Sequence, residues 1–225
     1  MDAVTKTIFG GQMIRVESIE TWGFRHAIRG MRNPMNSWTK SDSVGDSVGK
    51  ADLELMKRLF KGGTEHRKYL RQIFVCMDIT APLYWWKEFD TYKVGTTANS
   101  CSTMHKIADH SFTRKDFSCE HLDDDSLEFL DWMISVLNRN RSNYLETKDK
   151  RYWWNMIQLL PSSFNQKRTV TMNYENVYNI IRQRSGHKLD EWNRFVGILL
   201  NLPYIREIGD ISPEKTDFSE SVGNC

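Results

Sequence analysis

The alternation of apolar and polar residues predicts one well-defined β-strand near the middle of the chain, at residues 70–79. One face of this segment carries four apolar side chains, Ile73, Val75, Met77 and Ile79. A two-residue period of this kind is typical of a strand that packs one face against a core. Weaker patterns predict two shorter strands, at residues 13–18 and 168–172. The chain therefore has enough strands for one small sheet.

Apolar residues at helical spacing predict that helices make up most of the remaining chain. The predicted helices cover residues 21–31, 51–61, 83–93, 123–137, 144–160, 174–184 and 189–202. Pro82 permits the third of these to begin, because proline is tolerated in the first turn of a helix. Along that helix Trp85, Phe89 and Tyr92 form an aromatic stripe. Such a stripe is usually part of a core.

Two loops and a tail interrupt the helical pattern. Residues 37–49 form a polar loop of a length that is usually functional or mobile inside a compact domain. Residues 95–104 carry no charge but have six hydroxyl or carboxamide side chains. That composition suits either a simple connection or a site for an anion or a polar ring. We predict an α+β fold, helix-dominated with a small central sheet, as a single domain over residues 1–208 with a loose polar tail over 209–225.

Charge and cysteine content narrow the classes of function. The 225 residues carry a net charge of +2, which gives no electrostatic case for binding nucleic acid or an anionic membrane. No apolar run approaches the length of a membrane span, and we find no signal peptide. None of the four cysteines is spaced as CxxC, so we expect reduced thiols and a cytoplasmic protein.

Common catalytic and metal motifs are not found in the sequence. It contains neither GxGxxG nor GxxxxGK[ST], and Ser162 and Ser163 lack the flanking glycines of a hydrolase elbow. Three histidines and one cysteine gather at His105, His110, Cys119 and His121. Their spacing is not that of a standard zinc pair, so we predict no metal site.

Three separated segments instead resemble one known family. They are GTEH at 63–66 with FVCMDI at 74–79, then a helix ending in TYK at 91–93 with the loop 95–104, and finally the Leu160-Pro161, Asn173 and Arg182-x-Arg184 series. In order and spacing, over about residues 13–204, they resemble the flavin-dependent thymidylate synthases.

The resemblance implies a fold, an activity and a set of site residues. The fold would be that of flavin-dependent thymidylate synthases, assembled as a homotetramer that binds FAD where subunits meet. The activity would be methylation of dUMP, or a related pyrimidine nucleotide, with methylenetetrahydrofolate and NADPH. Arg184 would be the catalytic residue, and the family uses no cysteine nucleophile. The implied FAD contacts are His66, Tyr92, Lys93, Asn99 and Asn173. The implied nucleotide contacts are Lys93, Ser100, Ser102 and Arg184.

The chain departs from the family pattern at several cationic positions. The family Arg-His-Arg reads Thr91, Tyr92 and Lys93 here, and its last Arg is Met104. Each lost bidentate contact typically removes roughly 1.5–3 kcal/mol of binding. Two alternatives therefore stay open, a non-catalytic nucleotide-binding protein and a flavoenzyme acting on another nucleotide. A basic cluster before the 37–49 loop offers possible replacement cations, namely Arg25, Arg29, Arg32 and Lys40.

Overall fold

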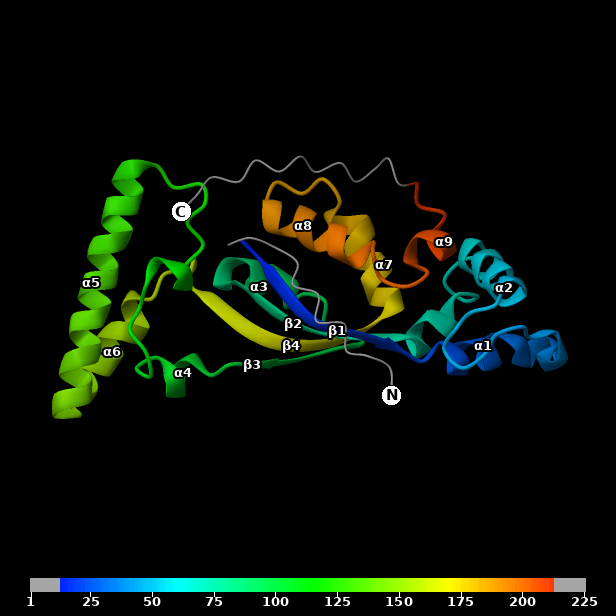
Figure 1. Cartoon of the computed structure of the whole chain (residues 1–225), viewed down its shortest axis with the longest axis horizontal. Helices are drawn as coiled ribbons and strands as arrows, with labels where there is room; N and C mark the ends of the chain where they lie inside the picture. The colour runs from blue at the N-terminus through cyan, green and yellow to red at the C-terminus, as the bar shows by residue number, and fades with distance from the viewer. Residues whose placement is uncertain (1–12, 213–225) are drawn as a thin grey trace.

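The computed structural model describes residues 13–212 and confirms a helix-rich α+β fold around one antiparallel sheet (Figure 1). The four strands are β1 (Arg15–Trp22), β2 (Phe74–Pro82), β3 (Thr96–Ser100) and β4 (Asn165–Asn173), in the spatial order β1-β2-β4-β3. Every neighbouring pair is antiparallel. β3 is thus an edge strand, and β2 and β4 form the centre of the sheet.

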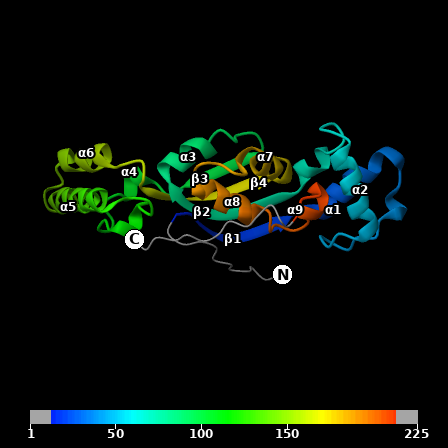
Figure 2. The same ribbon diagram turned by 90° about the horizontal axis from the view of Figure 1, so that it is seen from above.

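Helices cover one face of the sheet and both of its ends (Figures 1 and 2). Helices α3 (Leu83–Phe89), α7 (Tyr174–Arg184) and α8 (Asp190–Leu199) lie over the covered face. At one end are α1 (Phe24–Arg32), α2 (Lys50–Lys61) and α9 (Ile205–Gly209). At the other end, beyond the short α4 (Thr103–Lys106), α5 (Asp124–Thr147) and α6 (Lys150–Leu159) form an antiparallel hairpin.

The predicted alternation along β2 is confirmed, and it explains which face the helices cover. Ile73, Val75, Met77 and Ile79 are all fully buried, whereas the alternate positions along β2 are partly exposed. The aromatic stripe is also confirmed as core: Trp85 lies 4.7 Å from Trp192, between ring centroids. Burial of these large rings contributes on the order of 25 cal/mol per Å² of apolar surface.

Three predicted boundaries were wrong because tertiary contacts overrode local pattern. The uncharged loop 95–104 contains β3, since Thr96–Ser100 gains a full ladder with β4. The predicted break between 137 and 144 does not occur: Asn140 is buried, its Oδ1 accepts from Asn155 Nδ2 at 2.9 Å, and α5 runs on to Thr147. The strand predicted at 168–172 is longer, because its whole length pairs with β2.

Smaller corrections affect two helices beside the sheet. The helix predicted at 21–31 begins at Phe24, because β1 runs on to Trp22 and Gly23 turns the chain at a φ of 98°. The helix predicted at 83–93 ends at Phe89. Just beyond it, the Thr91 hydroxyl donates to the Glu88 carbonyl at 2.8 Å, a local bond that competes with helical pairing. Residues 213–225, most of the predicted tail, lie outside the described residues.

The 37–49 loop is held against α1 and α2 by one buried carboxylate. Asp52 is fully buried and accepts from Arg32 Nε at 2.6 Å, Ser41 Oγ at 2.6 Å and Ser43 Oγ at 2.7 Å. Burial raises the pKa of Asp52, but the bonds from Ser41, Ser43 and Arg32 outweigh it, so its pKa is lowered. Arg32 is therefore buried and paired with Asp52 inside the fold. It is not available as the replacement phosphate ligand that the sequence suggested.

Candidate functional site

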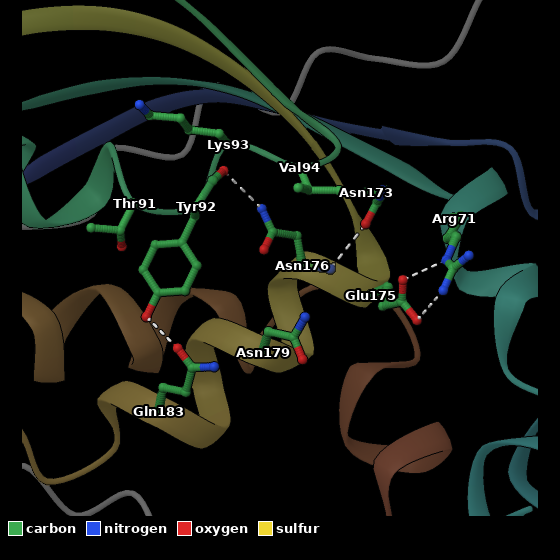
Figure 3. Close-up of a pocket in the computed structure, with 10 residues that line it drawn as sticks. All are labelled: Arg71, Thr91, Tyr92, Lys93, Val94, Asn173, Glu175, Asn176, Asn179 and Gln183. Atoms are coloured by element: carbon green, nitrogen blue, oxygen red, sulfur yellow. Dashed lines mark hydrogen bonds and ion pairs between the residues drawn. The ribbon is translucent and has the colours of Figure 1, made fainter. Parts of the chain in front are cut away.

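A pocket of about 440 Å³ opens beside α7, where the connection between α3 and β3 passes the end of β4 (Figure 3). Its walls come from this connection, from α7 and from the turn before β2. Carboxamides are the commonest polar side chains of its lining. They are Asn173, Asn176, Asn179 and Gln183. A carboxamide carries both a donor and an acceptor, so this wall can pair with the edge of a polar ring.

The start of α7 fixes the inner end of the pocket. Asn173 caps this helix, its Oδ1 accepting from the Asn176 backbone N–H at 2.9 Å. Gly95 has a φ of 72°, and a Cβ placed there would lie 2.1 Å from Asn173 Nδ2. Glycine is therefore required where the chain passes the cap. Asn176 also donates from Nδ2 to the Tyr92 carbonyl at 3.3 Å, which joins α7 to the connection after α3.

Tyr92 forms a polar contact at the border between the pocket and the core. Its ring is 8% exposed and lies 6.0 Å from the ring of Trp192. Its hydroxyl donates to Gln183 Oε1 at 3.0 Å and accepts from Arg184 Nε at 2.8 Å. The structure thus brings Tyr92, Lys93 and Asn173 together at the pocket, with Arg184 directly behind Tyr92.

Arg184 is held by contacts within the chain. Its Nη1 donates to Glu88 Oε2 at 2.7 Å, and its guanidinium carbon lies 4.6 Å from the ring centroid of Trp192. Trp192 Nε1 donates to the same Glu88 oxygen at 3.0 Å. A cation stacked on an indole and bonded to a carboxylate is well satisfied where it is. Arg184 therefore supports the wall of the pocket from behind.

The other cations of the pocket lie at its rim. Arg71 forms a two-bond ion pair with Glu175, with Nε 2.5 Å from Oε2 and Nη2 3.2 Å from Oε1. Lys93 is exposed, and its ammonium points away from the carboxamides (Figure 3). Lys93 makes no ion pair with any described residue, so it is the cation that a ligand phosphate can recruit most readily.

Besides Arg184, four residues implied by the resemblance do not line this pocket. His66 is exposed and follows α2. Asn99 and Ser100 belong to β3, where they pair with Thr169 and Arg168. Ser102 caps α4 by accepting from the His105 N–H at 3.2 Å. The described chain alone thus gathers only part of the predicted set.

Sequence reasoning missed most of the residues that line the pocket. They include Arg71, Asn176, Asn179 and Gln183. The signal was present in the sequence, because Asn173, Asn176 and Asn179 recur at three-residue spacing and a helix places such residues on one side. The helical spacing of Val177, Ile180 and Ile181 predicted only the buried, apolar face of α7.

Neither a metal site nor a membrane-spanning helix is found among the described residues. Between residues 13 and 212, no three side chains among His, Cys, Asp and Glu come together as a metal site. No described helix combines the length and apolar character needed to cross a bilayer. Cys76 and Cys101 are free thiols. The carboxamide pocket is the candidate functional site in the described part of the chain.

Comparison with solved structures identifies the fold. The flavin-dependent thymidylate synthase from Helicobacter pylori, complexed with FAD and dUMP, matches with a TM-score of 0.61 and 16% identity, over 87% of this chain and 92% of that one. A second structure of this Helicobacter pylori enzyme with FAD and dUMP gives 0.62 and 15%, over 90% and 94%. No family model and no curated protein matches the chain. The thymidylate synthase-like fold is thus confirmed.

Proposed function

We propose that the protein binds a pyrimidine nucleotide in the carboxamide pocket beside α7, with FAD as its cofactor. The observation that carries this proposal is the line of carboxamides from Asn173 to Gln183. A row of carboxamides offers both donors and acceptors, and the edge of a heteroaromatic ring carries both kinds of group. The neighbours of the same fold were solved with FAD and dUMP, which supports the same ligand classes here.

The residues present fit the ring of such a ligand better than its phosphates. Asn173, Asn179 and Gln183 would hold the polar edge of the ring. Lys93 would meet a phosphate, because Arg71 and Arg184 are paired with carboxylates. FAD, when bound, supplies hydride transfer to a carbon of the substrate. The chain itself would bind and orient the ring.

The first form of the proposal is enzymatic: methylation of dUMP with methylenetetrahydrofolate and NADPH, in a cytoplasmic homotetramer. Arg184 would then act near the nucleotide, as the family resemblance implies. In the tetramer, subunits would meet at the exposed edge strand β3, which carries Asn99 and Ser100. Light scattering on the purified protein measures its mass in solution and so tests the tetramer. The mass of a single chain would contradict it.

A second form is favoured by one specific observation, the internal bonding of Arg184. If Glu88 and Trp192 keep its guanidinium, the nucleotide is held without the family's catalytic cation. The protein would then be a non-catalytic nucleotide-binding protein on the same scaffold. The two forms share the pocket and differ in turnover.

One series of measurements tests both forms. The purified protein is examined for flavin absorbance, and binding of FAD and dUMP is measured by titration calorimetry. We expect FAD to bind and dUMP to bind more tightly in its presence. Formation of dTMP on addition of methylenetetrahydrofolate and NADPH, and growth rescue of a thymidine-requiring host, would support the enzymatic form. Binding without product would support the second form. Failure of both ligands to bind would contradict the proposal.

A further inference from the structure

The orientation of one pocket carboxamide, that of Gln183, is set by a chain of bonds behind it. Arg184 donates from Nε to the Tyr92 hydroxyl. That hydroxyl donates in turn to Gln183 Oε1, the bond drawn in Figure 3. Among the described residues, Nε2 of Gln183 makes no hydrogen bond. The oxygen of this amide is therefore occupied, and its N–H₂ group remains for a ligand.

The polarity of the chain follows from what each group can do. A guanidinium only donates, so the Tyr92 oxygen must accept from Arg184. The hydroxyl proton of Tyr92 then needs an acceptor of its own, and Gln183 Oε1 provides it at 3.0 Å. If the amide were flipped, the Tyr92 proton would lose this acceptor. The Tyr92 hydroxyl, itself oriented by Arg184, therefore fixes the oxygen of the Gln183 amide and leaves its nitrogen for the pocket.

The groups behind Gln183 are rigid enough to keep this polarity. The Tyr92 ring is almost completely buried, and Arg184 is bonded to Glu88 and stacked on Trp192. Gln183 itself is exposed, so its side chain would move freely without the bond to Tyr92. The pocket thus presents a preorganised donor on an otherwise mobile side chain.

We propose that Gln183 is a specificity-determining residue, which donates from Nε2 to the 4-carbonyl of a dioxopyrimidine ring. This proposal rests on the proposed function, since it names the ring that the pocket selects. Uracil and the pyrimidinedione ring of a flavin share this chemistry, a carbonyl beside a ring N–H. Cytosine has an amino group where uracil has its 4-carbonyl. A donor facing a donor leaves both unpaired, so cytosine is rejected.

The test compares the affinities of dUMP, dCMP and FAD for four forms of the protein, by titration calorimetry. They are the wild type, Gln183→Glu, Tyr92→Phe and the control Arg182→Gln. The control changes the charge of α7 by the same amount as Gln183→Glu, at an exposed position outside the pocket. The ratio of dUMP to dCMP affinity cancels any general effect of charge on phosphate binding.

For a nucleotide in contact with Gln183, the wild type binds dUMP roughly tenfold to a hundredfold more tightly than dCMP. Gln183→Glu inverts the preference, because its outward oxygen accepts from the cytosine amino group. Tyr92→Phe reduces the preference, since the amide can then turn either way. Arg182→Gln leaves the ratio unchanged. If the flavin ring is the partner, Gln183→Glu instead lowers the affinity for FAD roughly tenfold relative to Arg182→Gln. The ratio of dUMP to dCMP affinity then stays constant.

Two results would overturn the role of Gln183, and they differ from failure of the proposed function. If dUMP and FAD bind the wild type, but Gln183→Glu changes neither the nucleotide ratio nor FAD affinity, Gln183 selects nothing and the proposed function stands. If neither ligand binds the wild type, the proposed function fails together with the role of Gln183. Far-ultraviolet circular dichroism and unfolding midpoints confirm that each variant is folded before its affinities are compared.

Discussion

The Nε–H of Arg184 is bonded to the hydroxyl of Tyr92 at 2.8 Å, which joins the end of α7 to the connection that follows α3. Both residues stand where the family resemblance implies contacts to ligand. In this chain they contact each other, and Glu88 and Trp192 complete the cluster. The cluster links the aromatic core to the pocket wall, so changes in it alter stability and ligand recognition together.

Substitution Arg184→Lys is expected to lower the free energy of unfolding by about 1.5–3 kcal/mol. Lysine keeps the charge but cannot donate to Tyr92 and Glu88 at once while it stacks on Trp192. Urea unfolding followed by tryptophan fluorescence measures the loss. The matched control is Arg182→Lys, an exposed position on the same helix, with an expected change within about 0.5 kcal/mol. Equal effects of the two substitutions would contradict the structural role of Arg184.

Gly95→Ala is expected to destabilise the protein and to disturb the pocket. The new Cβ would lie 2.1 Å from Asn173 Nδ2 and would displace the cap of α7. The matched control is Gly186→Ala, where φ is also positive, at 70°, but no atom lies within 4 Å. In the control variant, backbone strain alone is expected to lower the free energy of unfolding by about 1 kcal/mol. Loss of the cap removes roughly 1 kcal/mol more at Gly95. Identical unfolding midpoints for the two variants would refute the close approach.

Asp52→Asn is expected to lower the free energy of unfolding by about 3 kcal/mol, because it leaves Arg32 buried without a counter-charge. The same substitution should release the 37–49 loop, which limited proteolysis detects. Glu54→Gln on the same helix breaks only an exposed pair with Lys57 and should leave the free energy of unfolding almost unchanged. A loss at Asp52 no larger than that at Glu54 would show that the buried pair does not stabilise the fold.

The difference between wild type and Asp52→Asn should depend on pH. Asp52 has a lowered pKa in the folded protein, below its ordinary value of 3.8. Its contribution is therefore fully present above about pH 4 and is lost as the pH falls through the folded pKa. Unfolding at pH 7 and near pH 2.5 should show a large difference between the two proteins at pH 7 and a smaller one in acid. A constant difference would contradict the lowered pKa.

Asn179→Ala is expected to lower the affinity of the pocket for its ligand by about tenfold. The free energy of unfolding should fall by no more than about 0.5 kcal/mol. Its carboxamide lines the pocket and makes no hydrogen bond to any described residue. The substitution should therefore remove a contact to the ligand and none within the fold. Calorimetry with dUMP and with FAD measures the change. Asn143→Ala removes a carboxamide from α5, outside the pocket, and should leave both affinities unchanged.

The sequence by itself determined the elements whose pattern expresses burial. The alternation in β2, the aromatic stripe of α3 and the bounds of α7 were predictable, because apolar residues must face the core at the period of their element. The residues that carry the family resemblance also led to the fold of the Helicobacter pylori enzyme. Asn173 was found in this way, and it lies at the pocket as the cap of α7.

Tertiary structure alone decided the partners of polar groups. Thr96–Ser100 is a strand only because β4 lies beside it, and no local pattern encodes that neighbour. Arg32 and Asp52 are twenty residues apart, so their pairing depends on how α1 meets α2. The bonds from Arg184 through Tyr92 to Gln183 join segments about ninety residues apart. Hydrogen bonds depend on distance and direction in space, which the order of residues along the chain does not contain.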